Sequence, residues 1–149
     1  DYLLQANLCF PEVRLRNFIE IRNHDCGTLE AVCAILAIYK GIFYSKSAMD
    51  EIEELLSPFK YNDFAELRYN VPKSGLDAKI ARVPVFEIAK EILYISEKSL
   101  IELNCGDEKY LDYIKNYTLE KLTPADILIR NWNGIWNKDM SKMLKFLTK

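Results

Sequence analysis

The stretch Glu12–Arg22, with the sequence EVRLRNFIEIR, decides how the rest of this 149-residue chain is interpreted. Its apolar residues Val13, Leu15, Ile19 and Ile21 fall on one parity, and Arg14, Arg16, Phe18, Glu20 and Arg22 fall on the other. A period of two is that of a β-strand, because successive side chains of a strand point to opposite faces. The stretch therefore predicts one strand over residues 12–22, with an apolar face and a charged face.

The sequence that follows, residues 28–149, predicts a helical region. Apolar residues recur there at helical spacing, and capping residues such as Thr28 and Thr123 precede several of these segments. The expected helices cover residues 28–44, 47–57, 62–69, 84–104, 107–122, 123–133 and 139–147. Asn70-Val71-Pro72 is expected to end the third helix, and Lys73-Ser74-Gly75 to form a loop. The predicted fold class is mainly α, or α+β overall, with about seven helices packed against the N-terminal strand.

The predicted strand needs a partner, because a lone strand leaves its backbone groups unpaired. No second strand is predicted elsewhere in the sequence, so its sheet is expected to lie largely outside this chain. The chain starts at Asp1 without a methionine, and we interpret residues 1–149 as a single fragment of a longer protein. In the fragment, the strand is expected to pair with the segment before Phe10, to fray, or to pair with its own copy in a homodimer.

Composition argues against several classes of protein. The formal net charge is −2, and lysines and glutamates alternate along the chain, so a nucleic-acid-binding face is not expected. The longest apolar run, Ala31–Tyr39, is far shorter than the roughly 20 residues that span a bilayer. The four cysteines and the single histidine lack the spacing of a zinc site or a disulfide framework; they are Cys9, Cys26, Cys33, Cys105 and His24. A cytoplasmic protein with neither nucleic acid nor membrane as a partner is expected.

The charged face of the predicted strand has two interpretations. In the first, it is a solvated sheet face with cross-strand ion pairs. In the second, its three arginines and Glu20 form a site for a magnesium nucleotide. A carboxylate oxygen suits the hard cation, and a planar guanidinium forks onto phosphate oxygens. The pattern alone does not choose between them.

Four blocks of the sequence resemble one enzyme family, in the order in which that family has them. They are Phe10-Pro11-Glu12-Val13-Arg14-Leu15-Arg16 with Phe18-Ile19-Glu20-Ile21-Arg22 and Asp25; Gly41-Ile42-Phe43-Tyr44; Val71-Pro72-Lys73-Ser74-Gly75-Leu76; and Thr123-Pro124-Ala125-Asp126 with Gly134-Ile135-Trp136. These blocks resemble the C-terminal part of glutamate-cysteine ligases, also called gamma-glutamylcysteine synthetases, of the plant and proteobacterial type. Asn23 and His24 depart from the family, which tends to have small residues there.

The resemblance implies a ligase that uses ATP and Mg²⁺ to join the gamma-carboxyl of glutamate to the amine of cysteine through a gamma-glutamyl phosphate. It also implies a fold similar to glutamine synthetase, with residues 12–22 as an active-site strand of an antiparallel sheet. Glu20 is then a magnesium ligand, and Arg22 is the catalytic arginine that meets the nucleotide phosphates. Arg14 and Arg16 share this face, and they either bind substrate or phosphate groups or form ion pairs within the sheet.

The partners that the resemblance implies are the N-terminal remainder of the same enzyme and the small molecules glutamate, cysteine and ATP. The chain alone is expected to be inactive, because one strand cannot supply every ligand of a magnesium nucleotide. Two alternatives remain open at this stage. One is a related carboxylate-amine ligase with another acceptor amine, and the other is a helical interaction module that shares these blocks.

Overall fold

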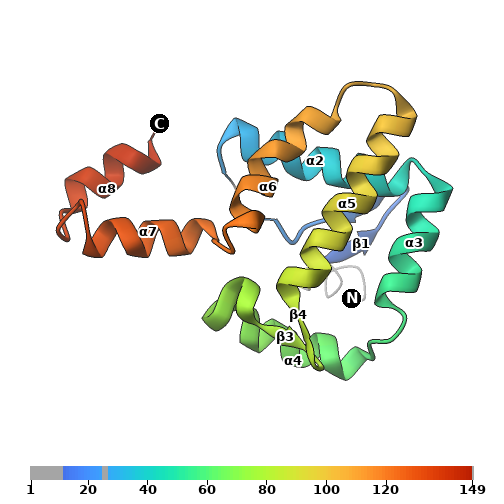
Figure 1. The fold of residues 1–149 in the computed structure, drawn as a ribbon, viewed down its shortest axis with the longest axis horizontal. Coiled ribbons are helices and arrows are strands. Elements are labelled where there is room, and N and C mark those ends of the chain that lie inside the picture. Colours follow the sequence, from blue (N-terminus) through green and yellow to red (C-terminus); the bar gives the residue numbers. More distant parts are fainter. Residues whose placement is uncertain (1–11, 25–26, 149) are drawn as a thin grey trace, which may run out of the picture.

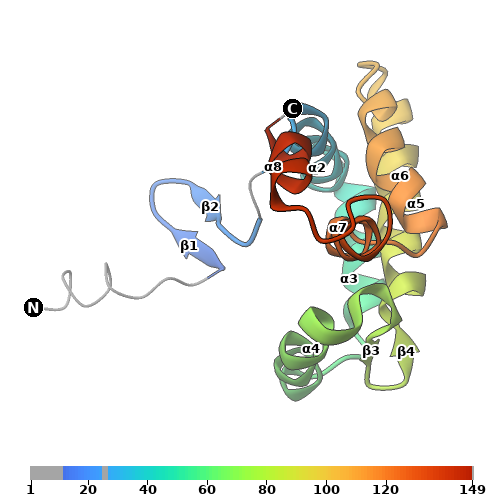
Figure 2. The same cartoon turned by 90° about the vertical axis from the view of Figure 1, so that its left-hand side faces the viewer.

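The computed structural model describes residues 12–24 and 27–148. Within these residues the chain forms seven α-helices and two hairpins of two strands each, so the prediction of a mainly α fold is confirmed. Figure 1 shows the helices gathered into a body, with the last two extending away from it. Figure 2 shows that the N-terminal hairpin stands apart from the helices.

The elements follow one another in a simple order. The hairpins are β1 (Val13–Leu15) with β2 (Ile19–Ile21), and β3 (Lys79–Ile80) with β4 (Val83–Pro84). The α-helices are α2 (Leu29–Phe43), α3 (Lys46–Leu56), α4 (Tyr61–Ser74), α5 (Val85–Leu103), α6 (Asp112–Leu119), α7 (Pro124–Asn133) and α8 (Met140–Leu147). Two 3-10 helices, η1 (Gly75–Asp77) and η2 (Glu108–Leu111), precede β3 and α6. None of the described helices is by itself long and apolar enough to cross a membrane; α2 and α3 pass that test of length and composition only together, as a pair bent by 96°.

The core of the helical body lies where α2 packs against α5. Gly41 on α2 makes this approach close, since a Cβ at that position would lie 2.5 Å from the backbone oxygen of Ser96. Next to this contact, α2, α5 and η2 contribute a buried apolar cluster of Ala37, Leu93, Leu100 and Leu111. The body therefore has a hydrophobic core of its own.

Several helices start with a side-chain cap at the residue expected from the sequence. The hydroxyl of Thr28 accepts a hydrogen bond from the backbone N–H of Ala31, and Asp139 caps α8 through its carboxylate. Thr123 and Asp126 form a capping box at α7, in which each side chain accepts a backbone N–H of the other residue. These caps satisfy N–H groups that lack a partner within the helix, which is why the sequence alone locates these three helix starts.

Three predicted helix boundaries are wrong. The cap of α3 is Ser45 rather than Ser47. Helix α4 continues through Pro72, because a proline in the last turn removes only one late hydrogen bond; Gly75, with a φ of 52°, then ends the helix. The single helix expected over residues 107–122 is divided into η2 and α6.

The β3–β4 hairpin is a further element that the sequence analysis missed. Each of its strands has two residues, so neither is long enough to show a period of two. Ala81, with a positive φ of 53°, lies in the turn between them. Ile80 is almost fully buried, and the hairpin therefore adds one apolar side chain to the interior of the body.

Candidate functional site

Residues 12–22 fold as a hairpin, not as the single strand that the sequence predicts. The antiparallel register places Val13 opposite Ile21, Arg14 opposite Glu20, and Leu15 opposite Ile19. The chain reverses at residues 16–18, where the N–H of Arg16 donates to the carbonyl oxygen of Phe18 at 2.8 Å. At the open end, the N–H of Arg22 donates to the carbonyl oxygen of Glu12, also at 2.8 Å. The predicted strand thus finds its hydrogen-bonding partner within the chain.

The symmetry of the hairpin explains the wrong prediction. Each pair of opposed residues lies at equal sequence distances on either side of Asn17. Opposed residues in an antiparallel pair project from the same face of the sheet, so this symmetrical pairing preserves the parity of the sequence. A continuous strand and a hairpin folded about Asn17 consequently have the same period of two. The expected separation into an apolar face and a charged face holds for the hairpin.

Glu20 lies at the centre of the charged face, near three arginines. Its Oε2 accepts a hydrogen bond from Nε of Arg14 at 2.7 Å and lies 2.6 Å from Nη2 of the same guanidinium. Nε of Arg16 lies 3.7 Å from Oε2, and Nε of Arg22 lies 3.9 Å from Oε1. The structure therefore brings together the four charged residues that the sequence analysis assigns to the site.

The arginines hold Glu20 in its ionised form. The hydrogen bond from Arg14 is the largest influence, and it lowers the pKa of Glu20 below the ordinary value of 4.5. Desolvation opposes this change, whereas the charges of Arg14, Arg22 and Arg16 lower the pKa further. Three cations around one carboxylate leave an excess of positive charge, which favours binding of a phosphate or carboxylate anion.

The three arginines differ in their position around Glu20. Arg14 forms the cross-strand ion pair that was one of its two expected roles, and its binding to a ligand stays a prediction. Arg16, in the turn, has a side chain that is 50% exposed. Arg22 follows β2 and is half-buried. The cluster is thus anchored at Arg14 and most accessible at Arg16.

Glu20 can give one oxygen to a metal ion, but the described residues do not complete a metal site. Within residues 12–24 and 27–148 there is no group of three or more His, Cys, Asp or Glu side chains that could hold an ion. Mg²⁺ requires near-octahedral coordination, usually by one or two carboxylates together with phosphate oxygens and waters. Glu20 therefore fits the role of one ligand among several. Asp25, which the family block includes, lies outside the described residues.

The opposite face of the hairpin is apolar and exposed. The side chains of Val13, Leu15 and Ile19 are 57%, 82% and 68% exposed, and Ile21 is half-buried. An isolated two-stranded hairpin is marginally stable in water. Contiguous exposed apolar residues of this kind indicate a contact with further polypeptide.

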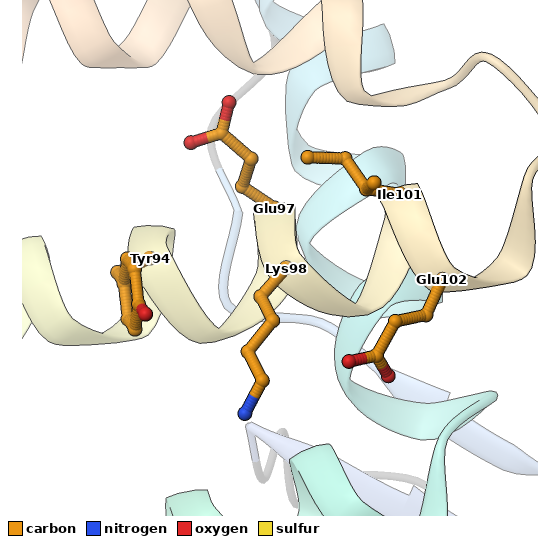
Figure 3. A pocket seen from close by; sticks show the side chains of 5 residues that line it. All are labelled: Tyr94, Glu97, Lys98, Ile101 and Glu102. Atoms are coloured by element: carbon orange, nitrogen blue, oxygen red, sulfur yellow. The ribbon is translucent and has the colours of Figure 1, made fainter.

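A shallow hollow on the outer surface of α5 does not belong to this charged cluster. It has a volume of about 290 Å³ and is lined by Tyr94, Glu97, Lys98, Ile101 and Glu102, all from one helix (Figure 3). Two of its charged side chains are engaged with neighbouring helices: Lys98 with Glu51 of α3, and Glu97 with Lys115 of α6. The hollow is therefore a solvated face of α5, whose charged side chains connect this helix to α3 and α6. None of the predicted site residues lines it.

Residues 1–140 match the sequence model of glutamate-cysteine ligase family 2, and the chain belongs to that family.

Individual relatives are similar over nearly the whole chain. It is 25% identical over 147 residues to the chloroplastic glutamate-cysteine ligase of Solanum lycopersicum. It is 27% identical over 147 residues to the chloroplastic glutamate-cysteine ligase A of Oryza sativa subsp. indica. These alignments cover 99% of this chain but only 28% and 30% of the two relatives. The chain thus spans less than a third of the length of the curated relatives that it matches.

Proposed function

We propose that this chain is the C-terminal part of an ATP- and Mg²⁺-dependent ligase that joins the gamma-carboxyl of glutamate to the amine of cysteine. Membership of the family supports ligase chemistry, and the names of the relatives support these two substrates. The observation that carries the proposal is the cluster of Glu20 with Arg14, Arg16 and Arg22. This cluster lies in the block of sequence by which the chain resembles the family.

The proposed reaction has two steps. In the first, an oxygen of the glutamate gamma-carboxylate attacks the terminal phosphorus of ATP, and ADP leaves. In the second, the amine of cysteine attacks the carbonyl carbon of the gamma-glutamyl phosphate; inorganic phosphate leaves and the amine loses a proton. Phosphoryl transfer depends mainly on positioning the reactants and neutralising the charge of the phosphate oxygens. A cluster with excess positive charge suits that task.

The residues of the cluster have distinct roles in this proposal. We assign Arg22 to the nucleotide phosphates and Glu20 to a magnesium ion, as the family resemblance implies. The lowered pKa of Glu20 keeps it an anion at neutral pH, which is the form that binds a hard cation. When bound, magnesium would neutralise charge on the phosphate oxygens. Arg14 fixes the Glu20 carboxylate through its hydrogen bond, and Arg16 is accessible to a substrate carboxylate or phosphate.

We assign the remaining ligands to the N-terminal part of the longer enzyme. The alignments, which cover less than a third of the relatives, and the exposed apolar face of the hairpin both support this assignment. We propose that this face packs against the rest of an antiparallel sheet. The family match over residues 1–140 favours the ligase over a helical interaction module.

The proposal is tested by assaying the complete parent enzyme for ADP release and for the amide product. With ATP, Mg²⁺ and glutamate, we expect cysteine to give gamma-glutamylcysteine and to support faster ADP release than other amines, such as glycine, serine or 2-aminobutyrate. A clear preference for another amine would assign the chain to a related carboxylate-amine ligase. The absence of ADP release with every amine would overturn the proposal.

A further inference from the structure

Within residues 12–24 and 27–148, an ion pair and a ring contact join the hairpin to the helical body, one near each end of the hairpin. Near the N-terminal end, the carboxylate of Glu12 forms an ion pair with the guanidinium of Arg68 on α4. Near the other end, the ring of His24 packs against the ring of Tyr39 on α2, with centroids 4.9 Å apart and planes inclined by 58°. These contacts bridge the separation between hairpin and helices that is visible in Figure 2.

The two contacts act on different strands. Glu12 immediately precedes β1, and His24 follows β2 by three residues. The hydrogen bond between the N–H of Arg22 and the carbonyl oxygen of Glu12 ties these two ends together. The helical body therefore contacts the hairpin from two sides, with α4 near the start of β1 and α2 beyond the end of β2.

The contact of His24 is the better anchored of the two. Tyr39 is half-buried on α2, where burial raises its pKa, and its ring stacks on Phe43 at a centroid distance of 5.7 Å. His24 is itself exposed, but its ring meets a half-buried tyrosine that stacks on a second aromatic ring. In contrast, the side chains of Glu12 and Arg68 are 49% and 68% exposed, and exposed ion pairs contribute little.

We infer that His24, and to a lesser degree Arg68, are positioning residues that orient the hairpin so that Glu20 and Arg22 meet the reactants. The inference rests on the proposed function, because it requires the charged cluster to face the reaction. Neither residue is needed to touch a reactant. A displacement of about 1 Å in a reacting group can lower a rate by roughly 100-fold, so the orientation of the hairpin matters.

The first experiment measures the orientation of the hairpin in the complete enzyme, independently of activity. Spin labels are attached through non-canonical amino acids at Asn17, in the turn of the hairpin, and at the exposed Glu66 on α4. We expect a narrow distance distribution for the parent sequence, a broad one for His24→Ala, and a narrow one again for His24→Phe, which keeps an aromatic ring on Tyr39. Asn23→Ala, at the residue that precedes His24, is the matched control and leaves the distance distribution narrow.

The second experiment measures steady-state kinetics of the same variants. An aromatic contact of this kind corresponds to a change of about 2- to 10-fold, and we expect His24→Ala to lower kcat in that range while the KM for cysteine is unchanged. His24→Phe recovers most of the loss, and the thermal unfolding temperature stays that of the parent. Arg68→Ala lowers kcat by about 2-fold or less. The double variant Glu12→Arg/Arg68→Glu, which reverses the ion pair, keeps kcat close to that of the parent.

The outcomes separate this inference from the proposed function. Unchanged distance distributions, together with parent-like kcat in an active enzyme, would overturn the positioning role. Failure of His24→Phe to restore the distribution would also overturn it, because the contact would then not act through an aromatic ring. A parent enzyme without ligase activity would refute the proposed function, while the spin-label distances would still decide whether His24 orients the hairpin.

Discussion

The β1–β2 hairpin and the α2–α5 contact place their apolar residues in opposite ways. In the helical body, small residues such as Gly41 let the two helices approach, and the apolar cluster around Leu100 is buried. In the hairpin, the apolar residue Leu15 is 82% exposed, whereas the charged residues Arg14 and Glu20 are half-buried. The body contains its own core, whereas the hairpin exposes the face that would normally be buried.

Under the proposed function, this difference separates stability from function in the chain. The helical body buries apolar surface internally, which is the main favourable contribution to folding. The polar face of the hairpin carries Glu20 and three arginines, which add little to stability because surface ion pairs contribute little. Changes in the hairpin are therefore expected to affect chemistry, and changes at the α2–α5 contact to affect folding.

The largest effect is expected on product formation when residues 1–149 are assayed without the rest of the proposed enzyme. The isolated chain of residues 1–149 should form no detectable gamma-glutamylcysteine from glutamate, cysteine and ATP, while circular dichroism reports a folded, mainly helical protein. The reason is that the described residues contain no group of three or more side chains that could hold a metal ion, whereas a magnesium nucleotide needs several oxygen ligands. Measurable product from the isolated chain would show that the hairpin completes a site without further polypeptide.

The next largest effect is expected on the charged face of the hairpin. In the complete enzyme, Glu20→Gln should lower kcat by roughly 100-fold or more, because the isosteric amide loses the negative charge that binds the cation. Ile21→Gln, on the opposite face, is the matched control and should reduce thermal stability by placing an amide against apolar neighbours. Similar effects of the two substitutions on kcat and on stability would contradict the assignment of faces.

A smaller effect is expected at the α2–α5 contact. Gly41→Ala should lower the free energy of unfolding of the isolated chain by about 1–2 kcal/mol, because the new methyl group meets the backbone of Ser96 and this cost outweighs the better helix propensity of alanine. Urea unfolding followed by circular dichroism measures the change. Leu36→Ala, at a side chain that is 62% exposed on the same helix, should change it by about 0.5 kcal/mol or less. Equal losses in the free energy of unfolding from Gly41→Ala and Leu36→Ala would show that the close contact at Gly41 is not part of the core.

The smallest effect is expected on the pKa of Glu20. Its pKa is lowered in the folded chain, so its contribution to stability is present above the unfolded value near 4.5 and is lost as the pH falls through the lower folded value. Carbon-13 NMR of the glutamate side chains should show Glu20 titrating below the exposed glutamates. Arg14→Ala should move the pKa of Glu20 back toward 4.5, because it removes the largest cause of the shift. A titration unchanged by Arg14→Ala would exclude the ion pair in solution.

Local chemistry in the sequence was sufficient to determine the helical region and the two faces of the N-terminal segment. Thr28, Thr123 and Asp139 locate helix starts because a cap depends only on a side chain and the next three residues. The alternation over residues 12–22 separates charged from apolar side chains because the parity of a strand is a local property. The family blocks likewise point to Glu20 and Arg22 as candidates from the sequence alone.

Tertiary structure decided what these local signals leave open. A period of two is the same for one strand and for a hairpin symmetrical about Asn17, so only the fold shows that Arg14 lies opposite Glu20. The continuation of α4 through Pro72 and the contact of His24 with Tyr39 were equally outside the reach of the pattern. Periodicity and capping report interactions between residues a few positions apart. Contacts between distant segments depend on how the whole chain packs, and they set the position of the charged cluster relative to the helical body.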